Sequence, residues 1–171
     1  MPTGHGALTV RIDPWADSDR ALLDELLGTY EMTAHLGGPE NSQWLDERHA
    51  RYRREGSRQY KVLVETVENG VGWVGYWERE WRGEQVWETG WAVIPAMQGR
   101  GMASAAMRLL LGVIASEPVS RPVHAFPSVD NGASNALCRK VGFTLLDAAD
   151  FEYPPGHVMR CNDWRLDPAG G

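Results

Sequence analysis

The chain has 171 residues and a formal net charge of −6, from 17 basic and 23 acidic side chains. One domain of this length buries a core and two would be cramped, so we expect a single domain over residues 1–171 with its core at 7–167. The acidic balance disfavours a general nucleic-acid-binding protein, and the 43% of hydrophobic residues exclude a disordered chain.

The first third of the chain predicts one strand and two helices. Apolar residues alternate in the strand, whereas they recur at helical spacing up to Tyr30 after a cap at Asp17 or Ser18. The second helix follows a glycine and proline break and ends before Gly56. In chain order these elements are a strand at 7–13, a helix up to 30 and a helix at 42–55.

The rest of the chain predicts six strands and two helices. A Glu68-Asn69-Gly70 turn joins the first two of these strands into a hairpin, and Gly142 ends the last helix. In chain order the elements are strands at 59–67, 72–81 and 86–95, a helix from 102 to near 118, a strand at 122–127, a helix at 131–141, and a hairpin of 143–146 with 158–166.

This order contains antiparallel hairpins and one crossover connection. The crossover runs through the helix that begins at residue 102 and connects the strands at 86–95 and 122–127. A strand–helix–strand crossover makes its two strands parallel neighbours. The sequence therefore predicts an α/β domain of the α+β type. Its sheet is mixed and mostly antiparallel, with about seven strands, a central parallel pair and about four helices.

The cysteines and the lengths of the apolar segments indicate the cellular compartment. Cys138 and Cys161 cannot form a disulfide framework, so we expect free thiols and a reducing compartment. No segment reaches the roughly 18 apolar residues of a membrane helix, and the first residues do not resemble a signal peptide. We therefore expect a cytoplasmic protein with no membrane partner and no nucleic-acid partner.

The loop Gln98-Gly99-Arg100-Gly101-Met102-Ala103 has two glycines where the longest helix begins. Amides at a helix start have no acceptor within the helix, and the helix dipole adds positive charge, so such a nest binds phosphate. A plain strand-to-helix turn would explain the same residues. The loop is not a Walker loop, because no Gly-Lys-Ser/Thr follows, and only two of the three glycines of the dinucleotide fingerprint are present.

Three motifs follow one another along the second half of the chain. Glu88-Thr89-Gly90-Trp91 reads E-x-G-Y/W, the loop after it reads Q/R-x-x-G-x-G/A, and residues 131–143 read N-x-x-S-x-x-L-x-x-x-x-G-F. In this order and spacing they resemble the GCN5-related N-acetyltransferase (GNAT) family. The first motif is similar to the branch that includes ribosomal-protein-alanine N-acetyltransferases.

The resemblance implies the GNAT fold and direct transfer of an acetyl group from acetyl-CoA, as cosubstrate, to an amine, without a metal. It implies that the loop amides bind the pyrophosphate, that the end of the preceding strand binds the pantetheine arm, and that the late helix contacts the pantetheine or thioester end. In that order, the implied residues are Gln98, Gly99, Arg100, Gly101, Met102 and Ala103; Trp91, Ala92, Val93 and Ile94; and Asn131, Ser134 and Asn135.

The reaction also needs a base, because an ammonium must lose a proton before it attacks a thioester. Glu88 matches the glutamate with this role in several family members, and burial among tryptophans would raise its pKa. The alternative is a structural glutamate paired across the hairpin with Arg79. The family often places a tyrosine beside the departing sulfur. Cys138 takes that position here, and Ser134 one turn earlier is an equal candidate.

The histidines and arginines carry weaker signals. The five histidines and two cysteines show no metal-ligand spacing, so we expect no metal. We expect His124 in the core and His35 and His49 toward solvent. The arginine-rich helix at 48–58 is predicted to be a solvated face with i,i+4 ion pairs, with an acidic acceptor or partner as the alternative.

Five of the eight tryptophans lie within residues 73–91 on two predicted strands. We predict an aromatic wall for the acceptor, with sheet packing as the alternative. The expected substrate-binding residues are Trp44, Trp73, Trp77 and Glu88. The expected acceptor is an amine of a small molecule or of a protein N-terminus, and the chain is expected to form a homodimer. Two other functions stay open: a transferase that uses another acyl-CoA, and a non-catalytic CoA-binding sensor.

Overall fold

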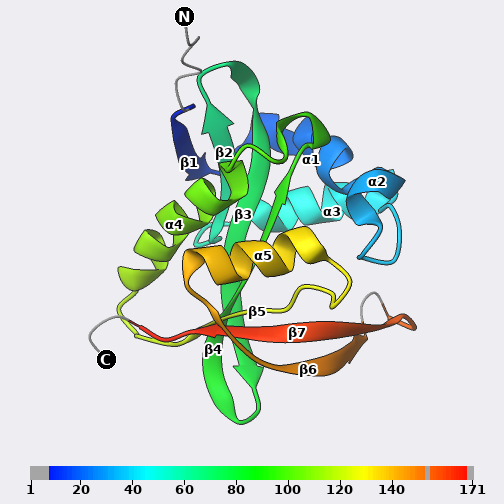
Figure 1. Ribbon diagram of the computed structural model, residues 1–171. Coiled ribbons are helices and arrows are strands. Elements are labelled where there is room, and N and C mark those ends of the chain that lie inside the picture. Colours follow the sequence, from blue (N-terminus) through cyan, green and yellow to red (C-terminus); the bar gives the residue numbers. More distant parts are fainter. Residues whose placement is uncertain (1–7, 153–154, 169–171) are drawn as a thin grey trace, which may run out of the picture.

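The computed structural model describes residues 8–152 and 155–168. Its centre is a seven-stranded sheet in the order β1-β2-β3-β4-β5-β7-β6. The strands are β1 (Val10–Pro14), β2 (Gln59–Val64), β3 (Val67–Trp81), β4 (Glu84–Val93), β5 (Val123–Ala125), β6 (Thr144–Glu152) and β7 (Val158–Leu166). Figure 1 shows the long β3–β4 hairpin running from top to bottom, with β7 crossing its lower half. The first strand was predicted from Ala7, which lies outside the described residues.

The helices cover both faces of this sheet. They are α1 (Arg20–Leu27), α2 (Tyr30–Thr33), α3 (Ser42–Tyr52), α4 (Met102–Ala115) and α5 (Gly132–Val141). In Figure 1, α4 and α5 lie in front of the sheet, and α1, α2 and α3 lie around its upper right. No described helix is both long and apolar enough to cross a membrane.

Each face of the sheet has its own core. Val74 belongs to the core that includes Met107 and Leu110 of α4. Trp73, the residue before it, packs against the core formed by α1 and α3. Successive side chains of a strand point to opposite faces, so alternation along β3 supplies both cores.

β4 and β5 form the parallel pair, and α4 connects them. The other adjacent strands pair antiparallel. The described pairing between β4 and β5 is short, because it joins Trp87 to Val123 and Glu88 to His124 and then stops. β4 continues to Val93 beyond this point, so the two strands separate after Glu88. The mixed sheet with a central parallel pair is the predicted architecture.

One predicted helix is divided. The leucine spacing predicted a continuous helix up to Tyr30, but α1 ends at Leu27 and α2 begins at Tyr30. Gly28 follows the last turn of α1, and Thr29 caps α2 with a side-chain oxygen that accepts from Met32 N at 3.3 Å. A glycine and a capping threonine break the helix although the apolar spacing continues.

The predicted turn at residues 68–70 is wrong. The β2–β3 hairpin turns at Glu65 and Thr66, and residues 68–70 lie inside β3. Gly70 has a φ of +88° and lies where the register between the two strands shifts. A glycine with positive φ serves a bulge as well as a turn, so the local signal placed the reversal too late.

Candidate active site

The glycine loop forms one wall of a cleft of about 1220 Å³. Gly99 and Gly101 have φ values of +73° and +78°, which a side chain disfavours. Gly101 is the N-cap of α4, and the first turn of this helix has no acidic side chain. Amides of a first helical turn have no acceptor within the helix. The loop therefore has the geometry of an anion-binding nest.

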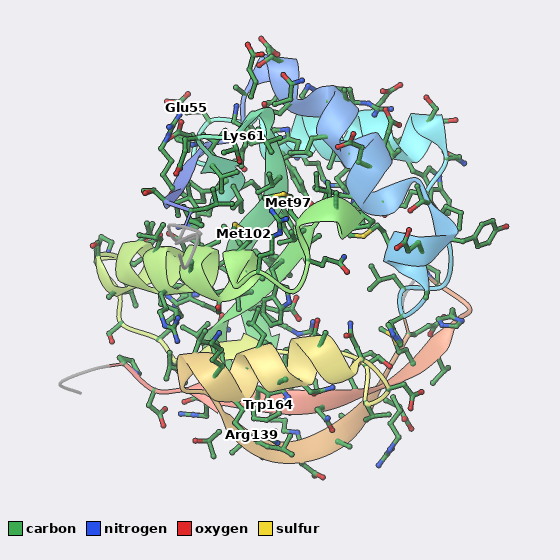
Figure 2. All side chains as sticks on the ribbon, turned by 45° about the horizontal axis from the view of Figure 1, so that its top comes forward. Glu55, Lys61, Met97, Met102, Arg139 and Trp164 are labelled. Atoms are coloured by element: carbon green, nitrogen blue, oxygen red, sulfur yellow. The ribbon has the colours of Figure 1, made fainter. Side chains whose placement is uncertain are left out.

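Buried methionines fix both ends of this loop. Met97 precedes the loop and Met102 follows its second glycine as the first residue of α4, and both side chains are buried. Figure 2 labels the two methionines. Gln98 Nε2 donates to the carbonyl of Val93 at 2.9 Å, which ties the loop to the end of β4. The Arg100 guanidinium lies 3.9 Å from Met97 Sδ. The backbone amides of the loop thus form the nest, and the neighbouring side chains hold the loop in position.

α5 forms a second wall of the cleft. The Asn131 side chain caps it by accepting from Ser134 N at 3.1 Å. Ser134 Oγ accepts from Trp91 Nε1 at 3.2 Å, which links α5 to β4 where β4 has separated from β5. Asn135 differs, because its amide donates to Ser128 O and its oxygen accepts from two side chains of β7. Asn131 and Ser134 line the cleft, whereas the Asn135 side chain is committed to holding the fold.

Cys138 is a residue of α5, and its side chain lies in the core that also contains side chains of α4. It is fully buried, and burial raises the pKa of its thiol to about 12. Cys138 is also absent from the residues that line the cleft, among which Ser134 is found. Of the two candidates for the group beside the departing sulfur, the structure brings Ser134 to the cleft. Both Cys138 and Cys161 are free and buried.

Glu88 lies at the last parallel pair, just before β4 leaves β5. Its side chain is 13% exposed and lines the cleft. Arg79 Nη1 donates to Glu88 Oε1 at 2.6 Å. Burial raises the pKa of Glu88, and the positive charge of Arg79 opposes that rise. The ion pair that was the alternative to catalysis is present, and the same carboxylate lines the cleft.

Three rings surround the Arg79 guanidinium, and we call them the aromatic box. The central carbon of the guanidinium lies 5.4 Å from the Trp81 ring centroid, 5.2 Å from Phe126 and 5.0 Å from Phe151. These distances are within the roughly 6 Å of cation–π attraction. The sequence did not predict the aromatic box. Phe126 follows His124 by two residues, so strand alternation could have placed both on one face, but Phe151 arrives only through the β6–β7 hairpin.

A buried carboxylate anchors this box. Asp163 is fully buried, accepts from Trp81 Nε1 at 2.9 Å, and lies 2.6 Å from His124 Nδ1. The His124 ring stacks on Phe126, with centroids 5.7 Å apart. His124 is in the core, as predicted. Asp163 therefore fixes Trp81 directly and Phe126 through the histidine.

A stack of three rings lines the cleft next to this box. Tyr52 stacks on Trp73 with centroids 5.6 Å apart, and Trp73 on Trp77 at 6.4 Å. Trp44 is 51% exposed on α3 and is not among the residues that line the cleft. Trp87 is buried in the core under α4. The structure thus gathers Trp73 and Trp77, adds Tyr52, and leaves Trp44 outside.

One prediction about α3 is wrong, and another holds in part. His49 is half-buried rather than solvent-facing, because its Nδ1 accepts from Trp15 Nε1 at 3.0 Å, and burial lowers its pKa. Arg48 forms its described ion pair with Glu40, which precedes the helix, and it also donates from Nη1 to Tyr52 Oη, one turn later in the helix, at 3.2 Å. The predicted solvated face is observed at Arg51, Arg53 and Arg54, which are exposed, whereas Leu45 and Tyr52 of α3 pack in a core with Trp15.

A family model places the chain among known proteins. The model described as an acetyltransferase (GNAT) domain matches residues 9–144. The chain belongs to the GNAT acetyltransferase family. No protein of curated function matches the sequence significantly.

Solved structures share the fold of this acetyltransferase. Salmonella typhimurium yncA, whose structure contains its cofactor acetyl-CoA, has 20% identity and a TM-score of 0.74 over 97% of this chain and 96% of that chain. The Salmonella typhimurium acetyl transferase that modifies the N-terminal serine of ribosomal protein L7/L12 has 20% identity and a TM-score of 0.73 over 93% and 95%. The aminoglycoside acetyltransferase AAC(6')-Ib, in complex with coenzyme A, has 17% identity and a TM-score of 0.70 over 93% and 95%.

The two glycines of the loop face open space in this acetyltransferase. A Cβ added at Gly99 would meet no atom within 4 Å, and one added at Gly101 would meet only Ser104 Oγ, at 3.9 Å. The space beside the loop is therefore open to a ligand. Within the described residues, no three His, Cys, Asp or Glu side chains gather in a way that could hold a metal.

Proposed function

We propose that the protein transfers an acetyl group from acetyl-CoA directly to a primary amine of a small molecule or of a protein N-terminus. The observation that carries this proposal is the place of Glu88. Its partly buried carboxylate lines the cleft at the residue after which β4 separates from β5, and the glycine loop and the stacked rings line the same cleft. A base there lies where an acceptor and a thioester would meet.

The cofactor side is built mainly from backbone. We assign the pyrophosphate to the amides of residues 98–103, and the pantetheine arm to the edge of β4 at residues 91–94, which runs free of β5. Asn131 and Ser134 line the cleft on the wall that α5 forms. The Asn135 side chain is occupied by other hydrogen bonds, so we give it a structural role.

The chemistry requires one proton transfer before the acyl transfer. Acetyl-CoA supplies a thioester carbonyl, which is open to attack by an amine. Glu88 takes a proton from the acceptor ammonium, and the amine nitrogen then bonds to the carbonyl carbon. The carbon–sulfur bond breaks, and the proton that the nitrogen loses in becoming an amide passes to the departing thiolate, which leaves as CoA thiol. The Ser134 hydroxyl donates a hydrogen bond to the departing sulfur. Burial of Glu88 favours this role because it raises the pKa of the carboxyl toward neutrality.

Two experiments test the proposal. A thermal shift with acetyl-CoA at about 100 times its Kd should stabilise the fold by roughly 2.7 kcal/mol. Release of CoA thiol is then followed with aminoglycosides, polyamines, amino acids and short peptides as acceptors. Stabilisation without thiol release for every amine would support the CoA-binding sensor instead. Faster release from propionyl-CoA or a longer acyl-CoA than from acetyl-CoA would support a different acyl donor.

Two further assignments accompany this function. We treat residues 7–167 as one acetyltransferase domain and the chain as a homodimer. Limited proteolysis that yields two stable fragments would contradict the first. Sedimentation equilibrium at the monomer mass of 19.0 kDa would contradict the second.

A further inference from the structure

Arg79 is a cation held rigidly inside the cleft. The aromatic box covers its guanidinium, with centroids 5.0 to 5.4 Å from the central carbon. The buried Asp163 holds the Trp81 ring of that box through its indole nitrogen, at 2.9 Å. An arginine fixed in this way loses little further side-chain entropy when it binds a ligand.

Most of the donors of this guanidinium are uncommitted. A guanidinium has five N–H groups, and among the described residues Arg79 uses one nitrogen, Nη1, to donate to Glu88. The side chain is 32% exposed and lines the cleft. The remaining N–H groups can therefore reach an anionic group that enters the cleft.

Arg79 differs from Arg48, the other cleft-lining arginine with a described ion pair. The Arg48 guanidinium is paired with Glu40, and its side chain is 17% exposed. No catalytic role is assigned to Glu40. The Arg48–Glu40 ion pair therefore serves as a structural part of the cleft wall. Arg79 instead pairs with Glu88, the carboxylate that accepts the proton in the proposed reaction. An acceptor that reaches Glu88 therefore meets Arg79 as well.

The cleft thus presents a carboxylate and a guanidinium side by side, with Oε1 and Nη1 only 2.6 Å apart. This is the charge pattern complementary to a zwitterion, in which an ammonium and a carboxylate are separated by one or two carbon atoms. We infer that the acceptor is an amine that carries a carboxylate close to the reacting nitrogen, as a free α-amino acid does. Arg79 binds that carboxylate while Glu88 receives the proton of the ammonium. This inference rests on the proposed function and narrows its acceptor class.

The first test uses the wild-type protein with matched acceptors. Leucine, methionine and phenylalanine are each compared with their amides and with the corresponding decarboxylated amines, in CoA thiol release from acetyl-CoA. Rates are referred to the concentration of free amine, because the amides are less basic. We expect kcat/KM for the free acids to exceed that of both analogues by about 10- to 100-fold, the range for a charge-assisted hydrogen bond.

The second test uses variants of Arg79. Arg79→Gln should abolish the preference for the free acid, and Arg79→Lys, which keeps the charge without the planar fork, should retain part of it. Arg82→Gln is the matched control, because Arg82 also lies over Trp81, at 5.0 Å, but is not among the cleft-lining residues. A thermal shift with acetyl-CoA shows whether each variant is folded and still binds the cofactor.

The outcomes separate the two levels of the proposal. A preference that is present in wild type and Arg82→Gln and lost in Arg79→Gln supports the inference. Amides or decarboxylated amines accepted as well as the acids would overturn it and leave the acetyltransferase function intact. Stabilisation by acetyl-CoA with no release for any amine would overturn the proposed function itself.

Discussion

The two sides of the cleft are built by different means. The loop side is formed by backbone amides and by glycines with positive φ in one continuous segment, residues 98–103. The acceptor side is formed by side chains from α3, β3, β4 and β6 and from the segment after β5, and Asp163 of β7 holds Trp81 and His124 in place. A backbone site depends on local conformation, whereas a side-chain site depends on the register of distant strands. Substitutions should therefore affect the two sides separately.

The largest expected effect is on the acceptor side. Glu88→Gln removes the base and should lower kcat by roughly 10²- to 10⁴-fold, with stabilisation by acetyl-CoA unchanged. Glu84→Gln, on the same strand but 46% exposed and paired with Arg165, is the control and should keep its activity. Steady-state thiol release measures both. A Glu88→Gln variant as fast as wild type with every acceptor would show that the base is another group.

The pH profile of the same reaction sharpens this prediction. Glu88 acts as a base only when ionised, and burial raises its pKa, so the acid limb of kcat/KM should lie above the range of an ordinary carboxyl. Arg79 holds that pKa down, so Arg79→Gln should move the acid limb to still higher pH. Rates from pH 5 to pH 9 measure the shift. An acid limb that does not move in Arg79→Gln would contradict the coupling.

The anchor of the acceptor side is expected to dominate stability. Asp163→Ala leaves Trp81 and His124 without their buried acceptor and should lower the free energy of unfolding by about 3–5 kcal/mol. Asp150→Ala removes an ion pair to Arg160 in which both side chains are more than half exposed, and should cost at most about 1 kcal/mol. Urea denaturation compares the two. Equal losses would mean that Asp163 is no anchor.

The loop side should respond to backbone strain. Gly101→Ala places a side chain at a φ of +78°, which costs roughly 1–2 kcal/mol and should weaken acetyl-CoA binding. Gly112→Ala is the matched control in the same helix, because a Cβ there meets nothing within 4 Å, and it should stabilise the fold by about 0.5–1 kcal/mol. Thermal melts and calorimetric titration with acetyl-CoA measure both. Unchanged affinity in Gly101→Ala would contradict a backbone nest.

The smallest expected effect compares two tryptophans. Trp77→Ala removes a ring that lines the cleft and stacks on Trp73, and it should raise the acceptor KM by roughly 2- to 10-fold. Trp44→Ala removes an exposed ring outside the cleft and should leave the KM unchanged. Equal increases in KM for the two substitutions would show that Trp44 also contributes to acceptor binding.

The sequence predicted the fold well where its signals were local. The strand alternation, the crossover and the two motifs at Gln98 and Asn131 led to the observed mixed sheet and to the family. The predictions failed where a local signal had two structural uses. The glycine at 70 serves a bulge instead of a turn, and Gly28 breaks a helix whose apolar spacing continues.

The candidate site divides in the same way. The sequence by itself determined the loop and named the pair of Glu88 and Arg79, because a nest uses consecutive residues and a hairpin sets its own neighbours. Only the tertiary structure decided that Ser134 lines the cleft while Cys138, one turn later, is buried, because the packing of α5 selects which face is covered. The tertiary structure also brought Phe151 to Arg79 and Asp163 to Trp81, across more than seventy residues of sequence in each case. Such contacts depend on the register of β6 and β7, and no local pattern specifies it.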